Sequence, residues 1–174
     1  MKQKNNIALM GMAGVGKSYI GKKIADISNY EHMETDELIV KQAIQEGKIY
    51  HDLSDENFLR LEKDVFMKLG DLSGKVIDTG ASVIYDQDVM SKITEFAHVV
   101  YIEDSIDVIE ERFIARGPVP LMGIEGKTFK QLFTERQPLY EKYAQFRVTR
   151  NSFRNNDALL VAEQILELVR DDKS

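Results

Sequence analysis

The stretch Gly11-Met12-Ala13-Gly14-Val15-Gly16-Lys17-Ser18 decides the fold class of this chain. It has the GxxxxGK[ST] spacing of a Walker A loop. The apolar run at residues 6–10 precedes it and apolar residues at helical spacing follow it, so the loop joins a buried strand to a helix. The glycines there turn backbone N–H groups toward an anion, and the helix N-terminus adds a positive dipole. We therefore predict that residues 11–18 bind the phosphates of a nucleotide.

Two side chains of the loop have separate tasks in this motif. Lys17 reaches the β- and γ-phosphates, and the Ser18 hydroxyl is a ligand for Mg²⁺, so the expected cofactors are ATP and Mg²⁺. The predicted phosphate-binding residues are Gly11, Met12, Ala13, Gly14, Val15, Gly16, Lys17, Ser18 and Tyr19.

Apolar runs bounded by turn residues recur along the chain. They predict further strands at residues 76–77, 99–102 and 146–149. Helical spacing recurs at residues 35–46, 55–69, 105–115, 128–143 and 156–169. Strands that alternate with helices predict an α/β fold, in which helices cover both faces of a parallel sheet. The Pro- and Gly-rich segment 116–126 joins two of these helices, and we expect it to be a mobile lid.

Length and composition limit the classes of protein. The 174 residues are expected to form one domain, and the formal net charge of −6 argues against general nucleic-acid binding. Only five apolar residues precede Gly11, too few for a signal peptide or a membrane span. With no cysteine in the sequence, we expect a cytoplasmic protein that does not associate with membranes.

Two acidic residues, Glu34 and Asp36, stand at the expected end of a second strand, which lies between the first helix and the helical stretch at residues 35–46. The carboxyl ends of parallel strands form the edge where such sheets bind ligands. A carboxylate there holds magnesium's water molecules or accepts the proton of an attacking hydroxyl. The alternative is that Thr35 or Asp36 only caps the next helix.

Four other charged residues have two interpretations each. Asp78 ends the third strand and is either a magnesium ligand or an ordinary carboxylate at a strand end. Arg112 precedes segment 116–126, Arg116 begins it, and Arg136 follows it. Guanidinium groups in such places stabilise a phosphoryl group during transfer, although single arginines on helices are usually surface residues.

The chain resembles the shikimate kinases over nearly its whole length. Besides the P-loop and the acidic pair, the resemblance rests on Thr79-Gly80, on Arg112, and on Glu135-Arg136-Gln137-Pro138-Leu139-Tyr140. It implies a three-layer P-loop NTPase fold of the nucleoside monophosphate kinase type, with five parallel strands. It also implies a monomeric enzyme that uses Mg²⁺-ATP to phosphorylate a ring hydroxyl of shikimate.

The resemblance also implies roles for single residues. Asp36 matches the aspartate that binds the substrate hydroxyls and serves as base, and Arg136 matches an arginine that binds the substrate carboxylate. Arg112 matches the arginine that stacks on adenine, and Glu34 stands where the family has an aspartate near magnesium. The substrate would rest against Gly80 and Ala81.

Three departures from the family pattern affect the acceptor site. Leu59 replaces a second arginine for the substrate carboxylate, and the neighbouring Arg60 is rotated by about 100° on a helix. Ala81-Ser82 replaces two of three consecutive glycines, so two Cβ atoms crowd the substrate. Val119 stands where the family has a lid arginine that touches phosphates, so this contact is missing unless Arg116 supplies it.

We therefore predict a small-molecule kinase in which Lys17, Asp36 and Arg136 are catalytic, with shikimate as the leading candidate acceptor. Two alternatives stay open at this point. One is a kinase for another small polyol, sugar acid or nucleotide. The other is a nucleotide-binding regulatory module without turnover.

Overall fold

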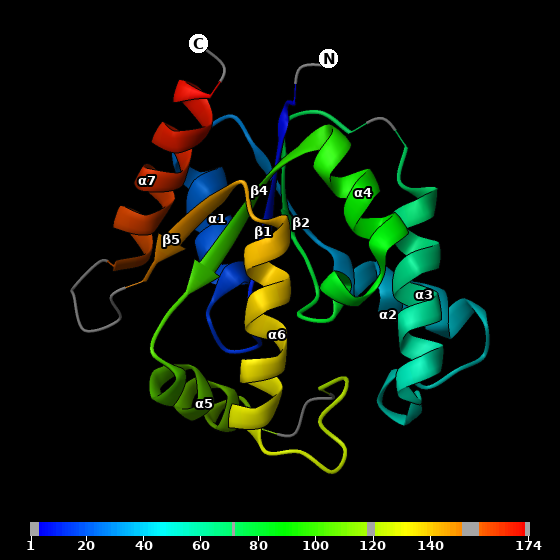
Figure 1. Ribbon diagram of the computed structural model, residues 1–174. Coiled ribbons are helices and arrows are strands. Elements are labelled where there is room, and N and C mark those ends of the chain that lie inside the picture. The colour runs from blue at the N-terminus through cyan, green and yellow to red at the C-terminus, as the bar shows by residue number, and fades with distance from the viewer. Residues whose placement is uncertain (1–3, 71, 118–120, 151–156, 173–174) are drawn as a thin grey trace.

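The computed structural model describes residues 4–70, 72–117, 121–150 and 157–172. Its centre is a sheet of five strands in the order β2-β3-β1-β4-β5, and every neighbouring pair is parallel (Figure 1). The strands are β1 (Asn6–Met10), β2 (Glu31–Glu34), β3 (Lys75–Asp78), β4 (Ala97–Glu103) and β5 (Phe146–Thr149). The predicted α/β class with a five-stranded parallel sheet is thus confirmed.

Seven α-helices lie between and after these strands within the described residues. They are α1 (Lys17–Ile27), α2 (Thr35–Gln45), α3 (Asp55–Lys68), α4 (Gln87–Phe96), α5 (Ile106–Ala115), α6 (Phe129–Tyr143) and α7 (Asp157–Asp171). Short 3₁₀ turns lie at Tyr50–Asp52 and Val83–Tyr85. None of these helices is long and apolar enough to cross a membrane.

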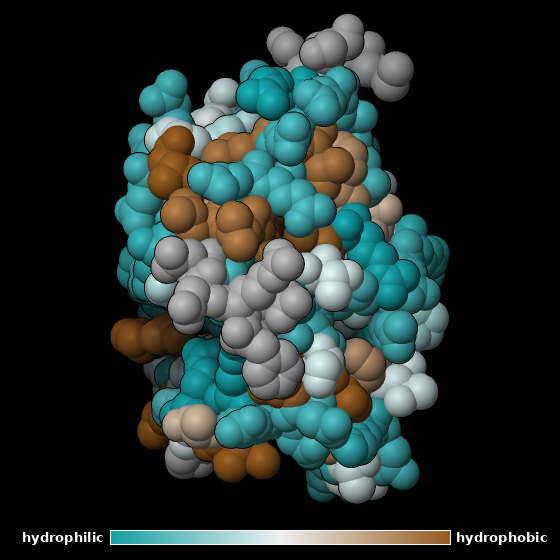
Figure 2. Space-filling view, turned by 90° about the vertical axis from the view of Figure 1, so that its left-hand side faces the viewer, coloured by the Kyte–Doolittle hydropathy of each residue, from teal (hydrophilic) through white to brown (hydrophobic). Residues whose placement is uncertain are grey.

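The helices form a layer on each face of the sheet (Figure 1). Alternate residues of β1 point to opposite faces, so Ile7 and Leu9 pack against α1 and α7, while Ala8 and Met10 pack against α4 and the inner sides of α3 and α6. A smaller apolar cluster joins α2 to α3. Figure 2 views the molecule from the left-hand side of Figure 1 and shows hydrophobic patches separated by hydrophilic side chains.

Most predicted elements are confirmed to within two residues at the ends that the structure describes, but one helix was missed. Helix α4 is ten residues long, begins after an N-cap at Asp86, and buries Val89, Met90 and Ile93. Two signals for it were present in the sequence: an aspartate, Asp86, at the N-cap position, and three apolar residues at helical spacing. In the structure, Asp86 accepts hydrogen bonds from two backbone N–H groups of the first turn.

Strands β1, β2 and β3 end side by side, next to the P-loop. Leu9 and Glu34 are both in register with Asp78. Two hydroxyls cross-link these ends: Thr79 Oγ1 donates to the carbonyl of Leu9 (2.9 Å) and Thr35 Oγ1 donates to the carbonyl of Asp78 (3.0 Å). Because both hydroxyls are buried, these hydrogen bonds hold the three strand ends in fixed positions relative to one another.

The predicted lid lies partly outside the described residues, which omit 118–120. In the part described, Leu121 and Met122 are buried. The Gly123 N–H donates to Asp55 Oδ2 on α3 (2.7 Å). Segment 121–126 therefore packs over α3 and α6 in this structure, and its mobility stays a prediction.

Candidate active site

The P-loop has the backbone conformation that its glycines predict. Gly11, Gly14 and Gly16 all have positive φ, and Gly16 (φ 94°) is the N-cap of α1. A side chain at Gly16 would collide with the guanidinium of Arg150, which donates to the Val15 carbonyl (2.9 Å). The loop therefore needs glycine both for its backbone turn and for the approach of Arg150.

Lys17 is buried beneath the loop. Its Nζ donates to the carbonyl of Gly11 (3.1 Å), so the side chain folds back across the phosphate-binding turn. Burial lowers the pKa of Lys17, while the carboxylates of Asp78 and Asp36 oppose this change. The side chain is thus a buried cation whose charge is partly balanced by two carboxylates.

Ser18 and Asp78 meet beside the P-loop. Ser18 Oγ donates to Asp78 Oδ2, and Asp78 is buried at the end of β3. Burial raises the pKa of Asp78, and Lys17 and the Ser18 hydrogen bond oppose this effect. A hydroxyl and a carboxylate beside bound phosphates are the oxygen ligands that suit Mg²⁺, so the residues present fit this ion.

Glu34, the predicted metal residue, is turned toward a different neighbour. Its carboxylate pairs with Lys22 of α1 (3.1 Å), and His32 Nδ1 lies 3.8 Å from the same oxygen. The Glu34 side chain is 26% exposed. It lies at the strand edge as expected, but its carboxylate contacts the outer part of α1.

A small pocket joins the P-loop to the remaining predicted residues. It offers about 60 Å³ to water-sized groups. Its lining comes from six separate segments of the chain: Ala13, Asp36, Phe58, Gly80 with Ala81 and Ser82, Leu121 with Met122, and Arg136. The predicted substrate residues Asp36, Gly80, Ala81 and Arg136 are thus brought together.

Arg136 is a fully buried wall of this pocket. Its guanidinium donates to the Tyr85 hydroxyl from Nε (3.1 Å), to the carbonyl of Met122 from Nη2, and to Met12 Sδ from Nη1 (3.9 Å). The guanidinium carbon of Arg136 also lies over the ring of Tyr85, 5.2 Å from the ring centroid. These contacts hold a buried cation in the wall of the pocket.

Asp36 lines the same pocket as Arg136 and is partly open to solvent. Withdrawal of solvent on the pocket side raises the pKa of Asp36, and the positive charges of Lys17 and Arg116 counteract this. Arg116 is exposed at the end of α5, so its charge reaches the site although its side chain lies on the surface.

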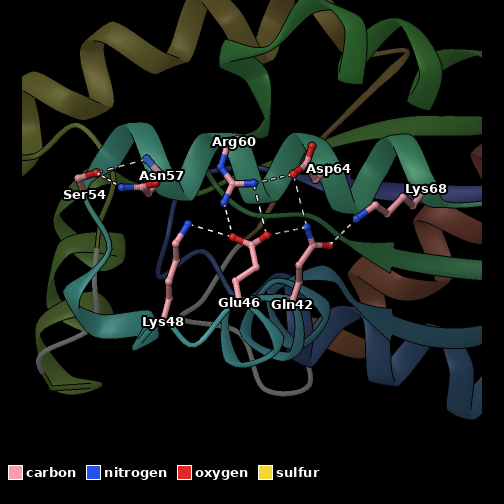
Figure 3. Close-up of polar contacts among 8 residues, drawn as sticks. All are labelled: Gln42, Glu46, Lys48, Ser54, Asn57, Arg60, Asp64 and Lys68. Atoms are coloured by element: carbon pink, nitrogen blue, oxygen red, sulfur yellow. Dashed lines mark hydrogen bonds and ion pairs between the residues drawn. The ribbon is translucent and has the colours of Figure 1, made fainter.

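Position 59 supplies no cation to the pocket, and Arg60 does not replace it. Figure 3 shows Arg60 on the outer side of α3, paired with Glu46 (2.5 Å) and Asp64 (2.8 Å). The prediction that one residue of rotation would direct Arg60 elsewhere is therefore confirmed. Val119 lies outside the described residues.

Two predicted nucleotide residues have side chains away from the pocket. Arg112 pairs with Asp104 (3.3 Å) at the end of β4, beyond the P-loop. The Tyr19 side chain is 56% exposed and lies beside Lys23 in a surface cleft lined also by α7. Tyr19 lies in the first turn of α1, directly after the P-loop, so its backbone is close to the loop although its side chain points to the surface.

Sequence reasoning missed the buried acid Glu62. Its Oε2 accepts a hydrogen bond from Ser82 Oγ (2.9 Å), and Oε1 lies against Gly80 and is without a partner among the described residues. Burial raises the pKa of Glu62 to about 8. The signal was its position: on α3 it falls on the apolar stripe of Phe58, Leu61, Val65 and Phe66.

Fold and site together define a class of protein. A P-loop at the edge of a parallel sheet, beside a small pocket with an acid and a buried arginine, is the arrangement of a P-loop kinase for a small molecule. The family model described as shikimate kinase matches residues 13–170. The chain belongs to the shikimate kinase family, and it is an ATP-dependent phosphotransferase with an alcohol group as acceptor.

Individual relatives agree with this assignment. The chain is 33% identical over 171 residues to a shikimate kinase of Pseudoalteromonas translucida, with 96% of this chain and 98% of the relative covered. It is 34% identical over 155 residues to a shikimate kinase of Francisella philomiragia, with coverages of 87% and 88%. These identities extend the family likeness beyond the P-loop to nearly the whole length of both chains.

Solved structures show the same fold. The shikimate kinase of Acinetobacter baumannii, in complex with shikimate, matches with a TM-score of 0.80 at 22% identity, covering 98% of this chain and 95% of that one. The shikimate kinase of Bacteroides thetaiotaomicron matches with a TM-score of 0.75 at 21% identity, with coverages of 95% and 98%.

Proposed function

We propose that this protein transfers the γ-phosphoryl group of Mg²⁺-ATP to a hydroxyl of shikimate. The observation that carries the proposal is the pocket in which Asp36 and the buried Arg136 flank the P-loop residue Ala13. Such a pocket offers an acceptor for a hydroxyl proton and a cation for a carboxylate, within one small volume next to the phosphate site. Shikimate carries both groups.

In the proposed mechanism, the chain positions two substrates and stabilises charge. The P-loop N–H groups and Lys17 bind the phosphates, and Asp36 orients the attacking hydroxyl and accepts its proton. Arg136 binds the carboxylate of the acceptor, which fixes the ring relative to the phosphates. When bound, Mg²⁺ neutralises charge on the β- and γ-phosphates.

The alternative acceptors are not favoured by the comparisons, but the replacement at Leu59 has a consequence for affinity. One charge-assisted hydrogen bond to the carboxylate is worth about 1.5–3 kcal/mol. If no other group replaces the missing arginine, shikimate is bound weakly. Compared with a kinase that has this arginine, the Michaelis constant for shikimate is then raised more than the Michaelis constant for ATP.

A coupled assay that separates ADP release from acceptor phosphorylation tests the proposal. We expect ADP release to require shikimate and to exceed that with other hydroxy acids, sugars and nucleosides. If another acceptor is phosphorylated in preference to shikimate, that acceptor is the substrate and the assignment of shikimate is wrong. ADP release that no acceptor stimulates would contradict transfer altogether.

The proposal also includes Mg²⁺ as the metal and a monomeric, cytoplasmic protein, as in the family resemblance. Sedimentation equilibrium tests the monomer, with a mass of 19.9 kDa expected. Titration of activity with Mg²⁺ and with Ca²⁺ tests the metal, because Ca²⁺ prefers more ligands and longer bonds.

A further inference from the structure

Two carboxylates compete for the role of metal residue at the edge of the sheet. Glu34 ends β2 and Asp78 ends β3, and the two residues are in register across the parallel ladder. Both therefore start from neighbouring points beside the P-loop. The directions of their side chains decide which one serves a cation bound at Ser18.

The Asp78 carboxylate is directed at the P-loop. Oδ2 accepts the hydrogen bond of Ser18 Oγ, and the side chain is among the strongest charges acting on Lys17. Its backbone carbonyl is held by the buried Thr35 hydroxyl. Asp78 is therefore fixed from two sides in a place where it faces the phosphate-binding groups.

The hydrogen bond from Ser18 to Asp78 also suits metal binding. A hydroxyl has one donor and two acceptor lone pairs. Because the Ser18 proton is directed to Asp78, the oxygen lone pairs remain available for a cation. A carboxylate that only neutralised Lys17 would not need this contact with the ligand hydroxyl.

The Glu34 carboxylate is engaged elsewhere. It pairs with Lys22, whose side chain is 62% exposed, and it lies near His32. Reaching the Ser18 hydroxyl would require Glu34 to leave both partners. Among the described residues, no group of three or more acidic, histidine or cysteine side chains forms a metal cage. A site of one hydroxyl, one carboxylate and phosphates is what remains, and Mg²⁺ commonly binds in this way.

We propose that Asp78, rather than Glu34, is the carboxylate of the magnesium site, where it orients the Ser18 hydroxyl and accepts hydrogen bonds from the water molecules of the ion. The inference rests on the proposed function only in taking Mg²⁺-nucleotide as the ligand. It reassigns the metal role from Glu34, and it leaves Glu34 as the partner of Lys22.

Calorimetric titration with ADP, in EDTA and in Mg²⁺, tests this inference without any acceptor. The proteins to compare are the wild type, Asp78→Asn and the matched control Glu34→Gln. In Asp78→Asn we expect ADP affinity in EDTA to stay equal or to rise, because a negative charge near the phosphates is removed. We expect the gain in affinity on adding Mg²⁺ to fall by about tenfold or more. Glu34→Gln should keep the wild-type gain within about twofold.

A direct readout of the metal accompanies the titrations. The electron paramagnetic resonance of Mn²⁺ with ADP reports the ion's affinity and surroundings, and it should change in Asp78→Asn but not in Glu34→Gln. Asp78→Ser, which removes the carboxylate in a smaller side chain, is the second variant if Asp78→Asn does not fold.

Three results would overturn the inference. The first is a wild-type response to Mg²⁺ in the Asp78 variants, and the second is a loss of that response in Glu34→Gln. The third is an equal fall of ADP affinity with and without metal in the Asp78 variants, which would mark Asp78 as a structural residue only. None of these results depends on shikimate, so failure of the proposed acceptor is a separate outcome.

Discussion

Lys17 is a buried residue whose side chain contacts the phosphate loop rather than the apolar core. We predict that Lys17→Ala lowers kcat by at least about 10²- to 10³-fold, because a cation aimed at the transferred phosphate is lost. The fold should survive, because the cost of burying the Lys17 charge is removed together with its attraction to Asp78 and Asp36, and the two changes oppose each other. Steady-state kinetics and thermal unfolding measure the two effects.

The matched control is Lys23→Ala, six residues along the same helix. Lys23 lies at the surface and pairs with Asp26 (3.2 Å). Its removal should leave turnover near the wild-type value. Normal turnover in a folded Lys17→Ala protein would exclude the P-loop lysine from the mechanism.

Glu62 makes stability depend on pH. Its pKa is raised from 4.5 in the unfolded chain to about 8 in the fold, so the folded state binds the proton more tightly. The stabilisation is complete below the unfolded value and is lost as pH rises toward 8. In this window a single group changes the free energy of unfolding by at most about 1.4 kcal/mol per pH unit.

The test compares the wild type with Glu62→Gln, which resembles the protonated acid at every pH. Urea unfolding at pH 5.5 and pH 8 should show the variant gaining stability relative to the wild type at the higher pH. A difference between the two proteins that does not change with pH would show that Glu62 titrates normally.

Helix α3 contributes to the pocket on one face and carries an ion-pair network on the other. Gln42, Glu46, Lys48, Arg60, Asp64 and Lys68 form that outer network (Figure 3). Phe58 lines the pocket, while Leu59 and Glu62 are three residues apart and thus neighbours on the helix surface. An arginine at position 59 would therefore lie next to Glu62 on the helix surface, one residue from Phe58 in the pocket lining.

We predict that Leu59→Arg raises kcat/KM for shikimate by about tenfold, because it restores a charge-assisted hydrogen bond. It should also lower the pKa of Glu62, and so flatten the pH dependence of stability. Crowding by Ala81 and Ser82 limits the gain. Kinetics and pH-dependent unfolding measure both effects on the same protein.

Arg60→Ala is the control on the same helix. Because Arg60 pairs with Glu46 and Asp64 on the outer face, its loss should not change the Michaelis constant for shikimate. A larger effect of Arg60→Ala than of Leu59→Arg on that constant would show that the substrate carboxylate contacts Arg60, which would contradict the prediction for position 59.

Segment 121–126 contributes Leu121 and Met122 to the pocket and is tied to α3 by Gly123 and Asp55. We predict that an ATP analogue together with shikimate slows hydrogen exchange in these residues, as expected of a lid. Peptides from α4 serve as the reference, because that helix packs on the sheet away from the pocket. Unchanged exchange in 121–126 with both ligands bound would contradict the lid.

At the scale of the whole molecule, the P-loop joins the central strand β1 to helix α1, and both belong to the main apolar cluster. Ligand binding should therefore stabilise the whole fold. At 100 times its dissociation constant, Mg²⁺-ADP adds about 2.7 kcal/mol, which corresponds to a rise in Tm of roughly 5 to 10 °C. Calorimetry measures the shift, which Lys17→Ala should reduce. No shift in the wild type would mean that this edge of the sheet does not bind nucleotide.

Local patterns were sufficient for the fold and for part of the site. The Walker A spacing placed Lys17 and Ser18, and the alternation of apolar runs with helical periodicity predicted the parallel sheet. Both signals lie within short stretches of chain, where backbone geometry follows from residue type. The strand-end position singled out Asp36 and the place beside the lid singled out Arg136; the resemblance to the shikimate kinases gave both their expected roles, and the structure brings them into one pocket.

Contacts between distant segments decided the rest. Asp78 faces Ser18 and Glu34 faces Lys22, although both acids stand at the ends of neighbouring strands. Glu62 became a buried acid beside Ser82 because α3 packs against the turn after β3. The direction of a side chain and its loss of solvent depend on strand register and helix rotation, and these are fixed only when residues far apart in the chain pack together.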